Sequence, residues 1–224
     1  MELILLPSVL TVVFATIFIV MRTKKKVVPS LVFKTLSGVS FVCTGVMACY
    51  LTTFDTYALF CIFGLIMGLC GDVIMQFKYF NAQTYKTFLI MGMAFFAIGH
   101  LFYLSAFYTL YTFSFIPFIV AAVLSLLIFF ILSAKEFERL GKLRIYCPIY
   151  FFLLSFLMAQ CVVGYILSPT IKGLALMIGM LSFIISDSVL GFIYFKVPNK
   201  RRFTVVNLIT YYVAQLLIAL SIML

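Results

Sequence analysis

Residues 64–80 read Gly64-Leu-Ile-Met-Gly-Leu-Cys-Gly-Asp72-Val-Ile-Met-Gln-Phe77-Lys-Tyr79-Phe80, an apolar run that carries one aspartate. Residues 179–195 repeat the pattern 115 residues later: Gly, Asp, Phe, Tyr and Phe recur at matching places, and Asp187 stands where Asp72 does. A carboxylate in hydrocarbon is costly unless it is paired, hydrated or used. The two stretches therefore predict membrane helices in which each aspartate has a functional or structural role.

Composition supports a membrane protein. Of the 224 residues, 66% are apolar and 10% are charged, which is far from the usage of soluble proteins. Eight apolar runs each approach the roughly 20 residues that a helix needs to cross about 30 Å of hydrocarbon. The runs are Leu3–Met21, Leu31–Leu51, Tyr57–Phe77, Phe88–Tyr108, Phe113–Ala134, Ile145–Leu167, Ile171–Phe195 and Val205–Leu224. We predict an all-α polytopic membrane protein with eight transmembrane helices, in a single membrane domain over residues 1–224.

The net charge of +10 follows membrane topology, so we expect no nucleic acid partner. Fifteen of the 16 basic residues lie in or near the loops after the odd-numbered runs, and Lys172 lies on the other side. The fifteen are Arg22, Lys24, Lys25, Lys26, Lys34, Lys78, Lys86, Lys135, Arg139, Lys142, Arg144, Lys196, Lys200, Arg201 and Arg202. The positive-inside rule places these loops in the cytoplasm, against anionic membrane lipids, and both termini outside. Short loops and the lack of tryptophan favour a bacterial cytoplasmic membrane over the endoplasmic reticulum.

The 115-residue offset predicts an internal duplication of four helices, with halves 1–112 and 113–224. It also pairs Tyr50 with Tyr165 and His100 with Gln215. Halves with an even number of spans insert in the same orientation, related by a pseudo-twofold axis along the membrane normal. Counting from the nearest basic residue places the two aspartates about 9 and 13 Å from the predicted cytoplasmic boundary. Similar depth lets the carboxyls share a site.

Asp72 and Asp187 are the candidate catalytic residues. Two carboxyls in one apolar site can hold one protonated acid and one ionised partner near neutral pH, as acid–base catalysis requires. Hydrogen bonding between helices, or a proton relay in transport, are the alternative roles for these acids.

Six further residues are candidates for substrate binding: Lys34, His100, Tyr103, Asn207, Tyr211 and Gln215. Lys34 either snorkels to the interface or contacts a lipid phosphate, and His100 either joins helices or lines a pocket. Asn207, Tyr211 and Gln215 are spaced four apart and share a helix face. A polar stripe in hydrocarbon should face protein or a cavity.

We expect no metal ion and no other cofactor. His100 is the single histidine, and the six cysteines form no CxxC pair. A lone histidine cannot build a multi-histidine zinc site.

With these residues in view, the chain resembles the YhhN-like family of membrane lysoplasmalogenases. The resemblance lies in Gly71-Asp72, Gly99-His100-Leu-Phe-Tyr103, Ser186-Asp187-Ser-Val-Leu190 and Thr210-Tyr211-Tyr212-Val-Ala214-Gln215, in this order and spacing. One departure is Thr35, where a proline is expected after Lys34. The resemblance implies a lysophospholipid substrate, a lysoplasmalogen, whose vinyl ether bond is hydrolysed to a fatty aldehyde and glycerophosphoethanolamine or glycerophosphocholine.

Two other classes of protein also place carboxylates in the membrane. A proton-coupled secondary transporter would use the two aspartates as a relay, but such proteins usually break helices at mid-membrane, and no proline lies there in this chain. An intramembrane aspartyl protease would need a GxGD motif, and the residues that end at Asp72 read Leu69-Cys70-Gly71-Asp72, without the first glycine.

Overall fold

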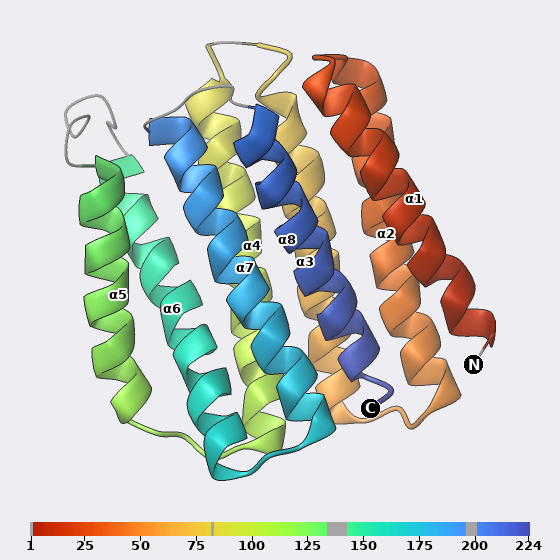
Figure 1. Cartoon of the computed structure of the whole chain (residues 1–224), viewed down its shortest axis with the longest axis vertical. Coiled ribbons are helices and arrows are strands. Elements are labelled where there is room, and N and C mark those ends of the chain that lie inside the picture. Colours follow the sequence, from red (N-terminus) through yellow and green to blue (C-terminus); the bar gives the residue numbers. More distant parts are fainter. Residues whose placement is uncertain (1, 82, 134–142, 196–200) are drawn as a thin grey trace.

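The structure is a computed structural model that describes residues 2–81, 83–133, 143–195 and 201–224. These residues form eight α-helices (Figure 1). The helices are α1 (Glu2–Thr23), α2 (Val27–Leu51), α3 (Thr56–Phe77), α4 (Tyr85–Leu110), α5 (Ile116–Ser133), α6 (Leu143–Leu167), α7 (Ile171–Phe195) and α8 (Arg201–Ser221). The predicted all-α class is confirmed.

Seven of these helices are long and apolar enough to cross a membrane, so the chain is an integral membrane protein. The exception is α5, which is apolar over the shorter stretch Ile116–Ile131. Its predicted span began at Phe113, whereas the helix begins at Ile116, directly before Pro117. Proline suits the first turn of a helix, where its missing N–H is not needed. The predicted end of this span, Ala134, lies outside the described residues.

Consecutive helices pack as four pairs, α1–α2, α3–α4, α5–α6 and α7–α8. In Figure 1, α7 and α8 lie in front of α3 and α4, with α1–α2 on one flank and α5–α6 on the other. Among the contacts between helices distant in the chain, α2 packs on α8, and α4 packs on α6. A four-helix repeat would relate these two contacts to one another. The repeat, its two halves and the single-domain organisation stay predictions.

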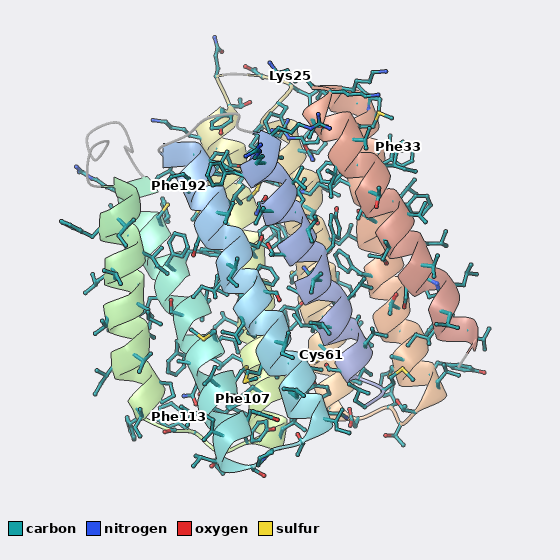
Figure 2. All side chains as sticks on the ribbon, in the orientation of Figure 1. Lys25, Phe33, Cys61, Phe107, Phe113 and Phe192 are labelled. Atoms are coloured by element: carbon teal, nitrogen blue, oxygen red, sulfur yellow. The ribbon has the colours of Figure 1, made fainter. Side chains whose placement is uncertain are left out.

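The ends of the bundle differ in charge. The α1–α2 turn and the α3–α4 loop lie at one end, called the basic end here, and both termini lie at the other (Figure 1). Lys25 marks the basic end in Figure 2, and Phe113 marks the opposite end. Five of the predicted cytoplasmic basic residues, Lys135, Arg139, Lys142, Lys196 and Lys200, lie outside the described residues. Which end faces the cytoplasm stays a prediction.

Glycines fix α3 against α4. A Cβ on Gly71 would lie 3.2 Å from the carbonyl oxygen of Gly92, and a Cβ on Gly99 would lie 3.1 Å from that of Gly64. Small residues at such positions let membrane helices approach until their backbones touch. This contact holds one side of α3, and Asp72 on the same helix bonds to α2 and α8.

Candidate active site at the basic end

A cavity of about 540 Å³ connects the basic end with both aspartates. Arg22, Lys25 and Lys78 line it together with Asp72 and Asp187. Apolar side chains supply much of its remaining wall: Leu89, Met93, Phe96, Phe151, Leu190 and Leu208. The acids of the two repeated stretches therefore face one space, although 115 residues separate them.

Asp72 is buried, with 2% of its surface exposed, and both of its oxygens are bonded. The Nζ of Lys34 on α2 lies 2.9 Å from its Oδ1. The hydroxyl of Tyr211 on α8 donates to its Oδ2 at 2.8 Å. A cation and a hydrogen-bond donor both stabilise the ionised form of a carboxyl group. The Asp72 carboxylate therefore links α3, on which it lies, to α2 and α8.

A chain of hydrogen bonds stands behind Asp72. The Nε2 of Gln215 donates to the hydroxyl of Tyr211 at 2.9 Å, and the hydroxyl of Tyr103 donates to Oε1 of Gln215 at 2.9 Å. Every donor points towards the carboxylate, so the bonds polarise one another. Gly68 makes room for this chain, because a Cβ there would lie 2.6 Å from Nε2 of Gln215.

Asp187 has different partners. The hydroxyl of Tyr150 on α6 donates to its Oδ2, and Nε2 of His100 on α4 lies 3.2 Å from that hydroxyl. Because the tyrosine proton is used on the carboxyl, we assign the histidine proton to Nε2. This assignment agrees with Nδ1 of His100, which is buried and has no hydrogen-bond partner among the residues that the structure describes. No lysine or arginine of the described residues pairs with Asp187.

The residue before Asp187 locks α7 to α8. The Nδ2 of Asn207 donates to the carbonyl oxygen and to the hydroxyl of Ser186, both at 2.9 Å. The Ser186 hydroxyl in turn donates to the carbonyl oxygen of Asn207 at 3.1 Å. These reciprocal bonds fix the rotation of α7 and thus the direction in which Asp187 projects.

Basic and aromatic side chains gather at the mouth of the cavity. Lys78, at the end of α3, is 3% exposed, and its Nζ donates to the hydroxyl of Tyr194 on α7. The guanidinium of Arg22 lies 3.6 Å from the centre of the Tyr79 ring. Burial, with the positive charges of Lys34 and Arg22, holds the pKa of Lys78 well below its usual value.

The structure divides the eight residues singled out from the sequence into two layers. Five line the cavity: Asp72, Asp187, Lys34, Asn207 and Tyr211. The other three, His100, Tyr103 and Gln215, are buried behind it and reach the carboxyls through tyrosine hydroxyls. The two carboxyls share the cavity without a hydrogen bond between them.

Sequence reasoning missed Tyr150 and Lys78. The predicted repeat contained a signal for the first, because the counterpart of Lys34 at the 115-residue offset is Ile149, next to Tyr150. Ile149 is exposed and Tyr150 is buried, so the residue of α6 that faces the site lies one position after the residue that the 115-residue offset indicates. In the sequence, Lys78 indicates the topology and the depth of Asp72, and nothing marks it as buried.

Within the described ranges, no three His, Cys, Asp or Glu side chains lie close enough to hold a metal ion together. Among family models, the one described as YhhN family matches residues 29–222. Comparisons with curated proteins and with solved structures gave no match.

Proposed function

This chain belongs to the YhhN family, which includes lysoplasmalogenases, and we propose that it hydrolyses the vinyl ether bond of lysoplasmalogens. The products are a fatty aldehyde and glycerophosphoethanolamine or glycerophosphocholine. The observation that carries the proposal is the unlike bonding of two carboxyls in one cavity. Asp72 is paired with the ammonium of Lys34, whereas the tyrosine hydroxyl that Asp187 meets is neutral. Such a pair can offer an acid and a carboxylate at the same pH.

Vinyl ether hydrolysis needs both groups. A proton adds to the alkenyl carbon remote from the ether oxygen, which creates an oxocarbenium ion. Water adds to the carbon next to the oxygen, and the resulting hemiacetal collapses to an aldehyde and an alcohol. Glycosidases meet the same demand with two carboxyls, one as acid and one beside the developing cation.

Asp187 is the acid in this scheme. In apolar surroundings without a paired cation, the neutral form of a carboxyl is favoured. Its Oδ2 accepts from Tyr150, which leaves the proton on Oδ1 for transfer to the alkenyl carbon. Tyr150 and His100 are positioning residues, because they orient the acid and touch no substrate atom in this scheme.

Asp72 is the ionised partner. Its negative charge stabilises the oxocarbenium ion, and it accepts a proton from the water that adds. When the hemiacetal collapses, Asp72 returns this proton to the glycerol oxygen, and the hemiacetal hydroxyl gives its own proton to Asp187. Both acids are then restored, and one water has been consumed. Lys34 keeps Asp72 charged, so we assign it this role in place of a phosphate contact.

The test is product analysis with two lipids. The purified protein in nanodiscs is given a lysoplasmenyl-ethanolamine and, separately, the 1-acyl lysolipid with the same headgroup. We expect free aldehyde from the first lipid and no fatty acid from the second. Release of fatty acid at a similar rate, or no aldehyde at all, contradicts the proposal. Movement of an unchanged solute across sealed vesicles would support the transporter.

A further inference from the structure

Lys78 is a buried lysine without an ion-pair partner among the described residues. Its ammonium lies in the wall of the cavity, and its neutral partner is the hydroxyl of Tyr194. Among the described residues the ion pair joins Lys34 to Asp72, and no carboxylate of these residues lies within ion-pair distance of Lys78. A buried charge without a counter-charge is costly. Among the described residues, the amino group of Lys78 therefore lacks a counter-charge in direct contact.

Other cations surround the same space. Arg22 and Lys25 line the mouth with Lys78, and Lys34 lies deeper. Like charges repel, and the lowered pKa of Lys78 reflects its burial and the neighbouring charges of Lys34 and Arg22. An anion placed among these side chains would relieve both the desolvation and the repulsion.

The turn that presents Lys25 has an unusual backbone. Lys25 has φ 57°, and the amides of Lys26 and Lys25 donate to the carbonyls of Met21 and Arg22 at 3.0 and 3.1 Å. This pattern closes a helix with a left-handed residue, a position that glycine usually fills. The chain instead keeps a lysine there, at the mouth of the cavity.

We propose that Arg22 and Lys78, with Lys25 at the rim, bind the phosphate of the lysolipid headgroup. This inference rests on the proposed function and adds to it the residues that hold the headgroup. Arg22 can meet two phosphate oxygens with its planar guanidinium, and Lys78 meets the phosphate as a point charge.

The spacing suits the substrate. Lys78 follows Asp72 by six residues on α3, a rise of about 9 Å. Seven bonds join the phosphorus of a lysoplasmalogen to its outer alkenyl carbon. At the reach of an extended backbone, about 3.6 Å for three bonds, they span about 8 Å. A phosphate at Lys78 therefore brings the reacting carbon to the level of the carboxyls.

Binding is tested apart from catalysis with a non-hydrolysable 1-O-alkyl lysophosphatidylethanolamine. We expect Lys78→Met or Arg22→Gln to raise its Kd by about 10- to 100-fold, since a hydrogen bond to a charged group is lost. Lys78→Arg should retain most of the affinity. Lys24→Met is the matched control, because Lys24 is an exposed lysine in the same turn that does not line the cavity. Unchanged affinity in both the Lys78→Met and Arg22→Gln variants, or equal losses in Lys24→Met, overturns the proposal.

A second readout uses substrates with and without phosphate. The wild type should prefer the lysoplasmenyl lipid to a 1-alkenyl glycerol in kcat/KM, and Lys78→Met should reduce this preference by the same 10- to 100-fold. A preference that survives the substitution overturns the phosphate site. If the wild type binds the alkyl analogue through Lys78 yet releases no aldehyde, the proposed reaction fails and the phosphate site stands. Displacement of the analogue by inorganic phosphate as readily as by lysolipid overturns the lipid headgroup as its ligand.

Discussion

The two aspartate stretches share a pattern but differ in what surrounds the acid. One turn before Asp72 stands Gly68, which leaves space for Gln215, whereas the matching residue before Asp187 is Phe183, whose ring packs edge-on against His100 with centroids 4.6 Å apart. The repeated pattern thus delivers both carboxyls to one cavity. The residues that differ between the copies determine which partners each acid meets.

The partner helices complete this difference. Each acid accepts a hydrogen bond from a tyrosine, and each tyrosine hydroxyl contacts one of two residues that lie 115 residues apart in the chain, Gln215 and His100. The asymmetry lies in the ammonium of Lys34, because no lysine or arginine in the described part of the chain pairs with Asp187. One added cation is enough to favour the ionised form at Asp72 while Asp187 keeps its proton.

Replacing each acid by its amide gives the largest expected effect. Asp187→Asn should lower kcat for aldehyde release by about 10²- to 10⁴-fold, the usual contribution of a general acid, with little loss of stability. Asp72→Asn should also lower kcat and, in addition, lower the Tm, because it leaves Lys34 buried without a partner. Equal effects of the two variants on Tm would contradict the difference between an ion-paired Asp72 and an Asp187 without a paired cation.

The ion pair itself is tested by a double-mutant cycle. Lys34→Met should cost about 3–5 kcal/mol of stability, since it strands a buried carboxylate. The double variant Lys34→Met/Asp72→Asn should recover most of this stability and none of the activity. Losses that simply add would mean that the two side chains are not coupled.

A methyl group added beside Gln215 should disturb the hydrogen bonds that lead to Asp72, whereas a methyl group added elsewhere in the core should not. Gly68→Ala directs a methyl group at Gln215 and should cost about 1–3 kcal/mol and lower kcat. Gly179→Ala is the control on α7: the three atoms nearest to its Cβ would be Cγ1 of Ile218 at 3.2 Å, the carbonyl oxygen of Ala214 at 3.4 Å and Cβ of Leu217 at 3.7 Å, and none of these atoms belongs to the site. It should affect the Tm alone. A fall in kcat for both variants would show only general sensitivity to packing.

Removing the hydroxyl of Tyr211 or of Tyr150 should give the smallest losses of stability, and the difference between the two losses reports the charge of each carboxyl. Tyr211→Phe removes a bond to a charged carboxylate, for which about 1.5–3 kcal/mol is expected, whereas Tyr150→Phe removes a bond to a neutral acid, for about 0.5–1.5 kcal/mol. Thermal unfolding in detergent measures both. A larger loss at Tyr150 would reverse the assignment of charge.

The fold class followed from the sequence because apolar runs of spanning length leave few other structures. The sequence identified the two acids and the stripe Asn207, Tyr211 and Gln215 because polar side chains are costly in hydrocarbon unless they have a partner or a function. The partner helices could not be deduced. Which residue of α6 meets Asp187 depends on the rotation of that helix, and a shift of one residue exchanges the exposed Ile149 for the buried Tyr150. The burial of Lys78 likewise depends on how α7 packs over the end of α3.

Infrared spectroscopy of the carboxyl groups tests the central claim most directly. The chain has only six acidic side chains, so the signal of one protonated carboxyl can be assigned by substitution. We expect the wild type at neutral pH to show the carbonyl stretch of a protonated carboxyl, retained in Asp72→Asn and lost in Asp187→Asn. Absence of this band from the wild type, or its loss in Asp72→Asn with retention in Asp187→Asn, would contradict the division of the two aspartates into acid and carboxylate.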